Sequence, residues 1–483
     1  MSLFDHEARQ FKFDVLKEVS KRAFEGRLNE NTCDEIARVL IPGKHADFRC
    51  CVYKEREIIR ERTRMAMGKP PVPCEQNNER QIVRVLDAAC DGCSIHKIQV
   101  TDNCRKCMAK SCLASCNFDA IHIGNDRAFI DYDKCKGCGA CKNACPFNAI
   151  VETQRPCMKS CPVDAISMDE NNYALINEEK CINCGACQAK CPFGAIEDMS
   201  WMVPVIEDIQ AGTKMIAVFA PAIQGQFDNA TLPQIMESIR QIGFEDAYEA
   251  AIGADAVAWY EKQDALAHKT EGKKITTSCC PAFVNMAKQH FPSVYAENVS
   301  HMVSPMVATA RYLKHHEPEA KVVFIGPCVA KKQEALDYEV DYCLTFEELG
   351  AMFVAKNISV ENVVPREDVT ASIFARNFSI GGGVSKAVVQ AMKECNDEVA
   401  LTSQYADGSA ECKKALLMMK VNRFDADILE GMACIGGCIN GPATIESAPK
   451  AKGRMAKENA AIKDKTIAST LETFDFKDIE LHR

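Results

Sequence analysis

Three short segments decide how the C-terminal half of this chain is built: TSCCP at residues 277–281, PCVAKKQE at 327–334 and MACIGGC at 432–438. Together they supply five cysteines from three separated places in the sequence. A 4Fe–4S cube is held by four cysteine thiolates, so four of these side chains can meet around one cube. Cys279 is then left beside the cube without a ligand role. A cube with a spare acidic thiol next to it predicts a centre that handles both electrons and protons.

The composition narrows the class of protein. The chain has 483 residues, of which 47% are hydrophobic and 26% charged, as in soluble globular proteins of two to four domains. The formal net charge is −9, and phosphate binding needs a basic surface, so we expect no nucleic-acid partner. An acidic electron carrier can still dock on a local basic patch.

The 28 cysteines indicate metal binding more than disulfides. Residues 1–6 begin no apolar signal segment, and no apolar run reaches membrane-spanning length. Cysteines inside the cell are kept reduced, and clustered ones more often bind metal. We therefore expect a cytoplasmic metal–sulfur protein with no membrane partner.

The middle of the chain repeats one cysteine unit. Cys-x2-Cys-x2-Cys-x3-Cys-Pro occurs in full at 135–146 and 181–192, as a variant at 104–116 and as a half unit at 157–162. All four copies are followed by an Ala-Ile pair, which argues for duplication. In bacterial ferredoxins of this spacing, three cysteines of one unit bind a cube and the fourth binds the other cube.

Applying this crossover to neighbouring units predicts four sets of ligands. The two sets from the full units are Cys135, Cys138, Cys141 with Cys191, and Cys181, Cys184, Cys187 with Cys145. The two further sets are Cys104, Cys107, Cys112 with Cys161, and Cys90, Cys93 with Cys116 and Cys157. These sixteen cysteines make four complete sets of four ligands, which favours four cubes. The alternative is one extra cluster, with some of these thiols unused. Zinc is improbable as the metal of the two full units, because their spacing is that of ferredoxins.

Three regions follow from these patterns. Residues 1–85 hold apolar residues at helical spacing and form a mostly helical N-terminal segment, and residues 86–204 form an α+β ferredoxin-like iron–sulfur domain. Residues 205–483 are expected to be α/β, because apolar runs such as 215–219 and 322–325 lead into proline-containing turns. Within the first region, the alternating charges of residues 54–64 predict a solvent-exposed helix.

The three C-terminal segments resemble the signature segments of FeFe hydrogenases. The likeness covers the ferredoxin-like units and nearly all of the C-terminal half, and implies an α/β H-cluster domain with two lobes around the active site. The implied cofactor is a 4Fe–4S cube sharing one cysteine with a two-iron subsite that carries CO, cyanide and a bridging azadithiolate. By position, the cube ligands of the family match Cys280, Cys328, Cys434 and Cys438, with Cys438 as the bridge.

The same resemblance implies roles near the two-iron unit. Cys279 matches the thiol that passes protons to the dithiolate, Lys331 the lysine that hydrogen-bonds a cyanide, and Glu334 a supporting acid. The implied proton relay continues through Glu261 to Ser300 and Asp264. Further positions face or pack against the two-iron unit in the family, and they match Ala220, Pro221 and Met432.

Residues just outside the cysteines depart from the best-known members of the family. Gly326 stands where those members have methionine, and Ala282-Phe283 replaces the usual Gly-Trp. Residues 440–443, Asn-Gly-Pro-Ala, replace a glycine-rich Gln-Pro ending. These changes are similar to the monomeric group B, or clostridial second-type, subfamily.

The resemblance implies an enzyme that catalyses 2H⁺ + 2e⁻ ⇌ H2. Its cubes would relay electrons to or from ferredoxin or flavodoxin, and hydrogenase maturation proteins would supply the H-cluster. One alternative is a non-catalytic hydrogenase-like iron–sulfur protein, against which the retained Cys279, Lys331 and Cys438 argue. Another is an H2 sensor or a subunit of a larger complex, although no glycine-rich phosphate loop follows a strand.

Overall fold

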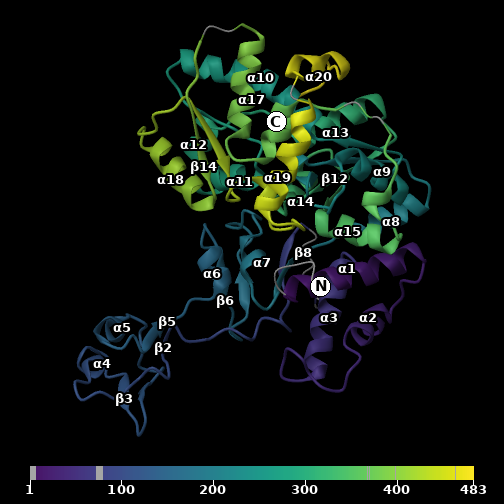
Figure 1. Cartoon of the computed structure of the whole chain (residues 1–483). Coiled ribbons are helices and arrows are strands. Elements are labelled where there is room, and N and C mark those ends of the chain that lie inside the picture. Colours follow the sequence, from purple (N-terminus) through teal and green to yellow (C-terminus); the bar gives the residue numbers. More distant parts are fainter. Residues whose placement is uncertain (1–6, 72–79, 367, 369, 397–398, 463) are drawn as a thin grey trace.

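The structure is a computed structural model that describes residues 7–71, 80–366, 368, 370–396, 399–462 and 464–483. Figure 1 shows helices of the N-terminal segment against a larger α/β body, with a small iron–sulfur region beneath it and one part of that region projecting away. No helix among the described residues is long and apolar enough to span a membrane.

The N-terminal segment is helical, as predicted. It contains α1 (Glu7–Phe24), α2 (Thr32–Leu40) and α3 (Val52–Ala66). Helix α1 buries Phe13, Leu16 and Val19 and packs along α15 (Phe346–Ala355) of the α/β body. An amphipathic helix of this kind is stable because its apolar face is covered by a neighbour.

Helix α3 is not the exposed helix that its charges predict. Glu55, Glu61 and Arg62 are all at most 4% exposed. One oxygen of Glu55 accepts the backbone N–H groups of residues 47–49, and Arg62 donates to the carbonyl of Gly194. The prediction was wrong because these charges find buried backbone partners, which an alternating charge pattern does not reveal.

The iron–sulfur region consists of two similar modules, one inserted into the other. In the inner module, residues 80–93 and 155–200, β1 (Val83–Val85) pairs with β8 (Ile196–Asp198) and β6 (Ile166–Met168) with β7 (Ala174–Ile176). In the outer module, residues 94–154, β2 (Ile98–Val100) pairs with β5 (Ile150–Glu152) and β3 (Ile121–Ile123) with β4 (Ala128–Ile130). All four pairs are antiparallel.

Each module also contains two short helices that pack together. They are α6 (Pro156–Ser160) with α7 (Ala186–Lys190), and α4 (Ser111–Ala114) with α5 (Ala140–Ala144). The Ala-Ile pairs that follow the cysteine units begin β3, β5, β6 and β8, and every one of them is buried. The sequence repeat therefore marks one turn–helix–strand unit. Its buried Ala-Ile pair lies on the interior side of the cysteines.

The α/β body contains two parallel sheets. One has the order β10 (Asp246–Glu249), β9 (Met215–Phe219), β12 (Lys321–Gly326), β13 (Tyr342–Thr345), and the other β11 (Ile275–Thr276), β15 (Ile428–Met432), β14 (Ser403–Asp407). Every residue of β9 and β15 is buried, as expected for parallel strands covered on both faces. The predicted α/β character is confirmed.

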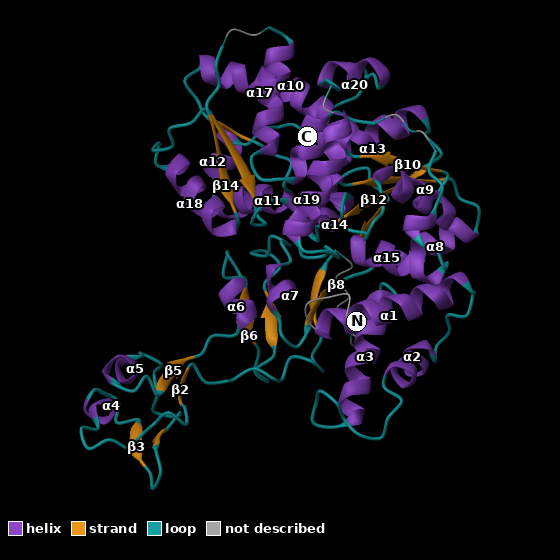
Figure 2. Ribbon diagram, viewed as in Figure 1, coloured by secondary structure: helices purple, strands orange, loops and turns teal. Residues whose placement is uncertain are grey.

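Helices surround both sheets, as Figure 2 shows. Besides α15, they are α8 (Met202–Gln210), α9 (Leu232–Ile242), α10 (Ala251–Thr270), α11 (Pro281–His290), α12 (Pro292–Asn298), α13 (Pro305–His316), α14 (Ala330–Asp337), α16 (Ile373–Arg376), α17 (Gly383–Glu394), α18 (Ser409–Lys420), α19 (Ala448–Asn459) and α20 (Ile467–Thr473). Prolines stand in the first turn of α11, α12 and α13, where a missing N–H costs nothing.

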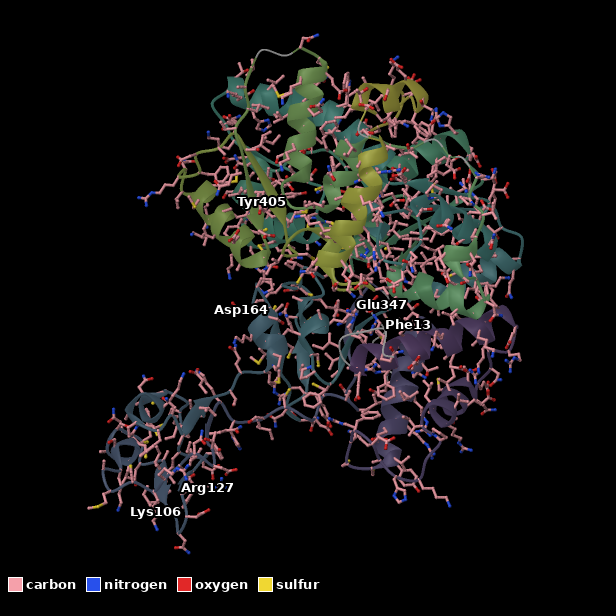
Figure 3. The ribbon with its side chains drawn as sticks, viewed as in Figure 1. Phe13, Lys106, Arg127, Asp164, Glu347 and Tyr405 are labelled. Carbon is pink, nitrogen blue, oxygen red and sulfur yellow. The ribbon has the colours of Figure 1, made fainter. Side chains whose placement is uncertain are left out.

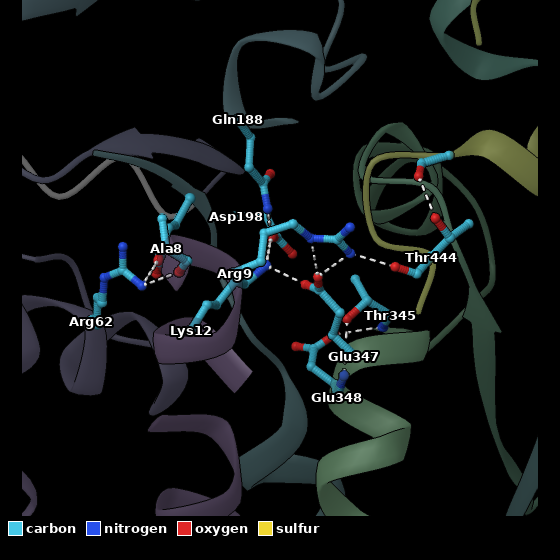
Figure 4. Close-up of polar contacts among 12 residues, drawn as sticks. Ala8, Arg9, Lys12, Arg62, Gln188, Asp198, Thr345, Glu347, Glu348 and Thr444 are labelled. Carbon is cyan, nitrogen blue, oxygen red and sulfur yellow. Dashed lines mark hydrogen bonds and ion pairs between the residues drawn. The ribbon is translucent and has the colours of Figure 1, made fainter. Parts of the chain in front are cut away.

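A buried group of charges joins the three regions. The Asp198 carboxylate accepts from Lys12 Nζ of α1 at 2.8 Å (Figure 4). It also accepts from Lys332 Nζ of α14 at 2.6 Å. Lys12 also pairs with Glu347 at 2.8 Å, and Lys332 with Glu348 at 3.2 Å. Burial alone would raise the pKa of Asp198, but Lys12 and Lys332 hold that pKa well below its usual range.

We predict that Asp198→Ala destabilises the folded protein strongly. The change leaves two ammonium groups buried without their shared partner, which typically costs about 3–5 kcal/mol. Asp337→Ala on the same helix as Lys332 is the control, because its exposed pair with Arg80 is worth about 0–1 kcal/mol. Anaerobic thermal unfolding should show a large drop in midpoint for the first variant only. Equal midpoints would contradict a joining role for Asp198.

Candidate iron–sulfur active site and relay

The three cysteine segments meet because each follows the end of a parallel strand. Cys280 comes after β11 and begins α11, Cys328 follows β12 and precedes α14, and Cys434 follows β15. Ala220 likewise comes directly after β9. In open α/β sheets, ligands bind beyond the carboxyl ends of the strands, and here two sheets bring their strand ends to one place.

These segments enclose a cavity of about 70 Å³. Its chemically reactive lining is Cys279, Cys328, Cys438 and Lys331. The rest of the wall is mostly apolar and includes Ala220, Pro221, Ala250, Ala254, Pro305, Met306, Phe324, Pro327, Phe378 and Met432. Predicted residues from four segments therefore line one cavity.

The four predicted cube ligands lie within electrostatic range of one another. Burial, followed by the charges of Cys328, Cys280 and Cys438, raises the pKa of Cys434 well above its usual value. Burial raises the pKa of Cys438 to about 12, with Cys328 and Cys280 adding to the shift. Thiols crowded in this way give up their protons only to a positively charged metal centre.

This donor set fits an iron–sulfur cube. No three Cys, His, Asp or Glu side chains in the described part of the chain are placed to hold a single metal ion. A cube instead offers a separate iron to each of four thiolates. The residues that would hold it here are Cys280, Cys328, Cys434 and Cys438.

Lys331 places a buried positive charge on the cavity wall. It is 9% exposed, and its Nζ donates to Glu334 at 2.5 Å, so the prediction that Glu334 supports Lys331 agrees with the contact. Burial would lower the pKa of Lys331, but the charge and hydrogen bond of Glu334, together with the charges of Cys328 and Cys279, outweigh burial and raise that pKa. The ammonium therefore stays protonated beside the thiols.

Cys279 lines the cavity, and the buried Glu261 lies within electrostatic range of Cys279. Burial, then the charge of Cys280, raises the pKa of Cys279 well above its usual value, and Glu261 contributes to the shift. Burial raises the pKa of Glu261 to about 7, and Ser300 opposes that shift. Ser300 is close enough to lower the pKa of Glu261, although neither Glu261 oxygen has a well-formed hydrogen bond among the described residues. A carboxyl that titrates near neutral pH suits proton transfer.

The predicted relay reaches the surface through Asp264. Its carboxylate is 3.8 Å from Nε2 of His482, whose side chain is half exposed. The C-terminal tail holds this end in place, because Met302 and His482 form a β-bridge and Arg483 N–H donates to the carbonyl of His301. Glu261 and Asp264 are one helical turn apart on α10 and interact electrostatically.

Sequence reasoning missed Glu430, a fully buried carboxylate whose charge reaches Cys279 and Cys438. It accepts N–H bonds from Gly382 at 2.8 Å and Ser385 at 2.9 Å, at the start of α17. Gly382 has φ 80°, a backbone conformation that favours glycine. The only sequence signal was one acid inside the otherwise buried strand β15.

The cysteines of the relay fall into four groups, but the predicted crossover between them is wrong. In the inner module, the pKa of Cys187 is raised by burial and by Cys184, Cys181 and Cys161. The pKa of Cys157 is raised to about 11 by burial and by Cys191, Cys90 and Cys93. The inner groups are therefore Cys181, Cys184, Cys187 with Cys161, and Cys90, Cys93, Cys157 with Cys191.

The outer module holds the other two groups. One cavity is lined by Cys104, Cys107, Cys112 and Cys145 together. Cys135 and Cys116 both act on Cys141, so the last group is Cys135, Cys138 and Cys141 with Cys116. Each group thus draws all its cysteines from one module.

The physical reason for the error is the insertion. Cys90-x2-Cys93 and Cys157-x3-Cys161-Pro are two halves of one unit, separated by the outer module. Its crossover partner is the unit at 181–192, whose helix α7 packs on α6. Neighbours in sequence were therefore not partners in space.

One inner group adjoins the candidate active site. The charge of Cys184 contributes to the raised pKa of Cys434, and that of Cys328 to the raised pKa of Cys184. Gly185 lies where an added Cβ would meet Pro442 and Val329 of the α/β body, at 2.7 and 3.2 Å. The contact between inner module and body is therefore made by the cysteine loops themselves.

Comparisons with known proteins agree with this geometry. An α/β domain that gathers buried cysteines beside two ferredoxin-like modules defines an iron–sulfur protein. Residues 213–442, just under half of the chain, match the family described as "Iron only hydrogenase large subunit, C-terminal domain", so this part of the chain is an iron-only hydrogenase domain. Residues 128–151 match a 4Fe-4S binding domain, and residues 151–202 match the LdpA Fe-S cluster-binding domain.

Individual relatives are distant. The periplasmic Fe hydrogenase large subunit of Nitratidesulfovibrio vulgaris is 26% identical over 68% of this chain and 89% of its own length. Iron hydrogenase 1 of Clostridium pasteurianum is 26% identical over 66% of this chain, and the match spans 65% of that protein, just under two thirds. A solved apo FeFe-hydrogenase structure from Chlamydomonas reinhardtii has a TM-score of 0.47 and 19% identity, covering 56% of this chain and 94% of that one.

The corrected grouping predicts which double variants lose a second cube. Cys161→Ser and Cys184→Ser affect one group, so the double variant should lose about four irons, as each single variant does. Cys161→Ser with Cys145→Ser affects two groups and should lose about eight. Iron analysis of anaerobically purified protein measures the difference. A loss of about eight irons in both double variants would instead support the crossover predicted from neighbouring units.

Proposed function

We propose that this chain is an FeFe hydrogenase that catalyses 2H⁺ + 2e⁻ ⇌ H2. The observation that carries the proposal is the cavity where Cys279, Cys328, Cys438 and Lys331 meet behind an apolar wall. Cysteines alone would serve an electron-transfer cube. Here a buried ammonium and a thiol that is not a cube ligand face the same cavity. Both groups suit chemistry on a negatively charged metal unit that carries diatomic ligands.

Cys280, Cys328, Cys434 and Cys438 would hold the cube of an H-cluster, with Cys438 as its bridge to the two-iron subsite. When bound, the cofactor supplies the redox-active iron at which protons and electrons combine. Maturation proteins would insert the subsite, and Lys331, fixed by Glu334, would orient its cyanide. Ala220, Pro221 and Met432 belong to the apolar wall that excludes water from this unit.

Protons would move along groups that the chain itself provides. Cys279 exchanges a proton with the site, and Glu261 reloads Cys279 from behind. Ser300 and Asp264 continue the path, and Asp264 meets the half-exposed His482 at the surface. Burial raises the pKa of both Cys279 and Glu261 and so favours their protonated forms.

Electrons would pass through four cubes, two in each module, and then to the H-cluster. The group of Cys161, Cys181, Cys184 and Cys187 is the last step, because it adjoins Cys328 and Cys434. Ferredoxin or flavodoxin in the cytoplasm would exchange electrons with the outer module. We further propose domain boundaries near residues 85 and 204. Strand β1, residues 83–85, belongs to the inner module because it pairs with β8.

Two local exchanges support placement in the group B subfamily. An added Cβ at Gly326 would lie 2.6 Å from the Phe324 ring, so Phe324 fills the space of the side chain missing there. An added Cβ at Gly431 would lie 2.3 Å from the Phe283 ring, so phenylalanine in place of tryptophan packs onto a glycine. Each departure from the best-known members thus has a partner that completes the packing.

The first test is the spectrum and activity of matured protein. Infrared bands of CO and cyanide should appear in the parent chain and in Cys279→Ala, because Cys279 is not a ligand. Turnover should fall by about 10²–10⁴-fold in Cys279→Ala only. Cys33→Ala, in α2, is the matched control and should keep full activity. Absence of the bands in the matured parent chain would sink the enzyme proposal.

Glu261 should set the pH dependence of H2 production. Its pKa of about 7 lies above that of an ordinary glutamate, so its proton is present at acid pH and lost as the pH rises through 7. H2 production should fall over the same interval. Glu261→Gln should lose about 10²-fold or more of the rate.

Glu61→Gln is the control for Glu261→Gln. Glu61 is also buried and its pKa is likewise raised to about 7, but it lies on α3 in the N-terminal segment. Its variant should keep the parent rate and the parent pH profile. Equal loss in both variants would mean that Glu261 matters for folding and not for proton transfer.

A further inference from the structure

The outermost cysteine group lies at the far end of the outer module. Figure 3 shows Lys106 at the tip of this module, well away from the α/β body. The cavity shared by Cys104, Cys107, Cys112 and Cys145 is also lined by Arg105, Lys106, Lys110 and Phe147. Basic side chains therefore form the outer wall of a cube site.

This wall carries an uncancelled positive charge on an acidic protein. Residues 105–110, RKCMAK, hold three bases and no acid, whereas the whole chain has a net charge of −9. Lys106 donates to the carbonyl of Asn125, and neither Arg105 nor Lys110 has an ion-pair partner among the described residues.

The second cube site of the outer module differs. Its loop, residues 131–136, holds two acids and two bases, and Lys134 pairs with Asp131 at 3.6 Å. The charges there cancel. Of the two cysteine loops of the outer module, the loop at 105–110 is the one with an excess of basic residues.

An apolar centre accompanies the bases. Met108, between Cys107 and Lys110, is 98% exposed, and Phe147 on the same cavity is 48% exposed. An apolar centre with a charged rim is the anatomy of protein interfaces, and small transient redox interfaces need only a modest area. Methionine adapts to several partners because its side chain is flexible.

We propose that the surface formed by Arg105, Lys106, Met108, Lys110 and Phe147, the tip surface, docks an acidic one-electron carrier protein of the ferredoxin type. The proposal rests on the proposed function, because it names the partner of that electron relay. Opposite charge steers the carrier to the tip, and Met108 with Phe147 forms the dry contact. One electron then passes from the reduced carrier to the oxidised cube behind the wall, with no bond made or broken.

Charge reversal tests the tip surface directly. The variant Arg105→Glu with Lys110→Glu changes no cysteine and no residue of the α/β body. With reduced, acidic 2×4Fe–4S ferredoxin at low salt, its rate of H2 production should fall about tenfold or more. The rate with reduced methyl viologen, a small cation that needs no docking surface, should not change. Added salt should shrink the difference between variant and parent.

The matched control moves the same charge elsewhere. Lys452→Glu with Lys457→Glu alters two exposed lysines of α19 and should leave the ferredoxin rate at the parent value. A second variant, Met108→Ala, keeps every charge and should raise the KM for ferredoxin without lowering the viologen rate. If iron analysis shows that the charge-reversal variant has lost a cube, Met108→Ala becomes the variant that tests the proposal.

A failure of docking can be told from a failure of the proposed function. Stopped-flow reduction of the chain's own cubes by ferredoxin requires no H2 chemistry, and it should slow in the tip variants even if no hydrogenase activity exists. Unchanged stopped-flow rates in both tip variants would overturn the proposal. Loss of single-stranded DNA binding with an unchanged ferredoxin rate would also overturn it, and would identify a nucleic-acid surface instead.

Discussion

The arrangement of the active centre depends on one buried carboxylate. Asp198 ends the last strand of the inner module and binds Lys12 of the N-terminal helix and Lys332 of the α/β body. It also accepts from the amide of Gln188 at 2.8 Å, next to Cys187. Lys332 in turn follows Lys331. Because unpaired buried charges are so unfavourable, only the assembled arrangement satisfies all these groups, and it places the last relay site against the cavity.

The nested modules show how a relay can be lengthened without disturbing its inner end. The outer module joins the inner one through two chain segments, which Thr153 ties together by donating to the carbonyls of Lys97 and His96, both contacts at 2.7 Å. The His96 and Tyr132 rings stack with centroids 3.4 Å apart and brace this connection. The inner module closes around the interruption because β1 and β8 pair across it.

Spacing predicted local features well and long-range ones poorly. Cysteine spacing and buried apolar runs indicated the α/β body, and the segments around Cys279, Cys328 and Cys438 do line one cavity. The predicted crossover was wrong because the outer module is inserted into one cysteine unit. The two halves of that unit lie together in the structure but far apart in the sequence. Glu430 was missed because it acts on the site only through the packing of β15 against the start of α17. The individual roles of the site residues stay predictions.

The confinement of every cysteine group to one module has a consequence for damage. Oxidative loss of the exposed outermost cube would remove no ligand from the inner groups, since none of their cysteines lies within residues 94–154. The proposed electron path would lose its outer part, and the cysteine groups nearest the candidate active site would keep all their ligands. Loss of ligands at the exposed tip would therefore stay confined to the outer module.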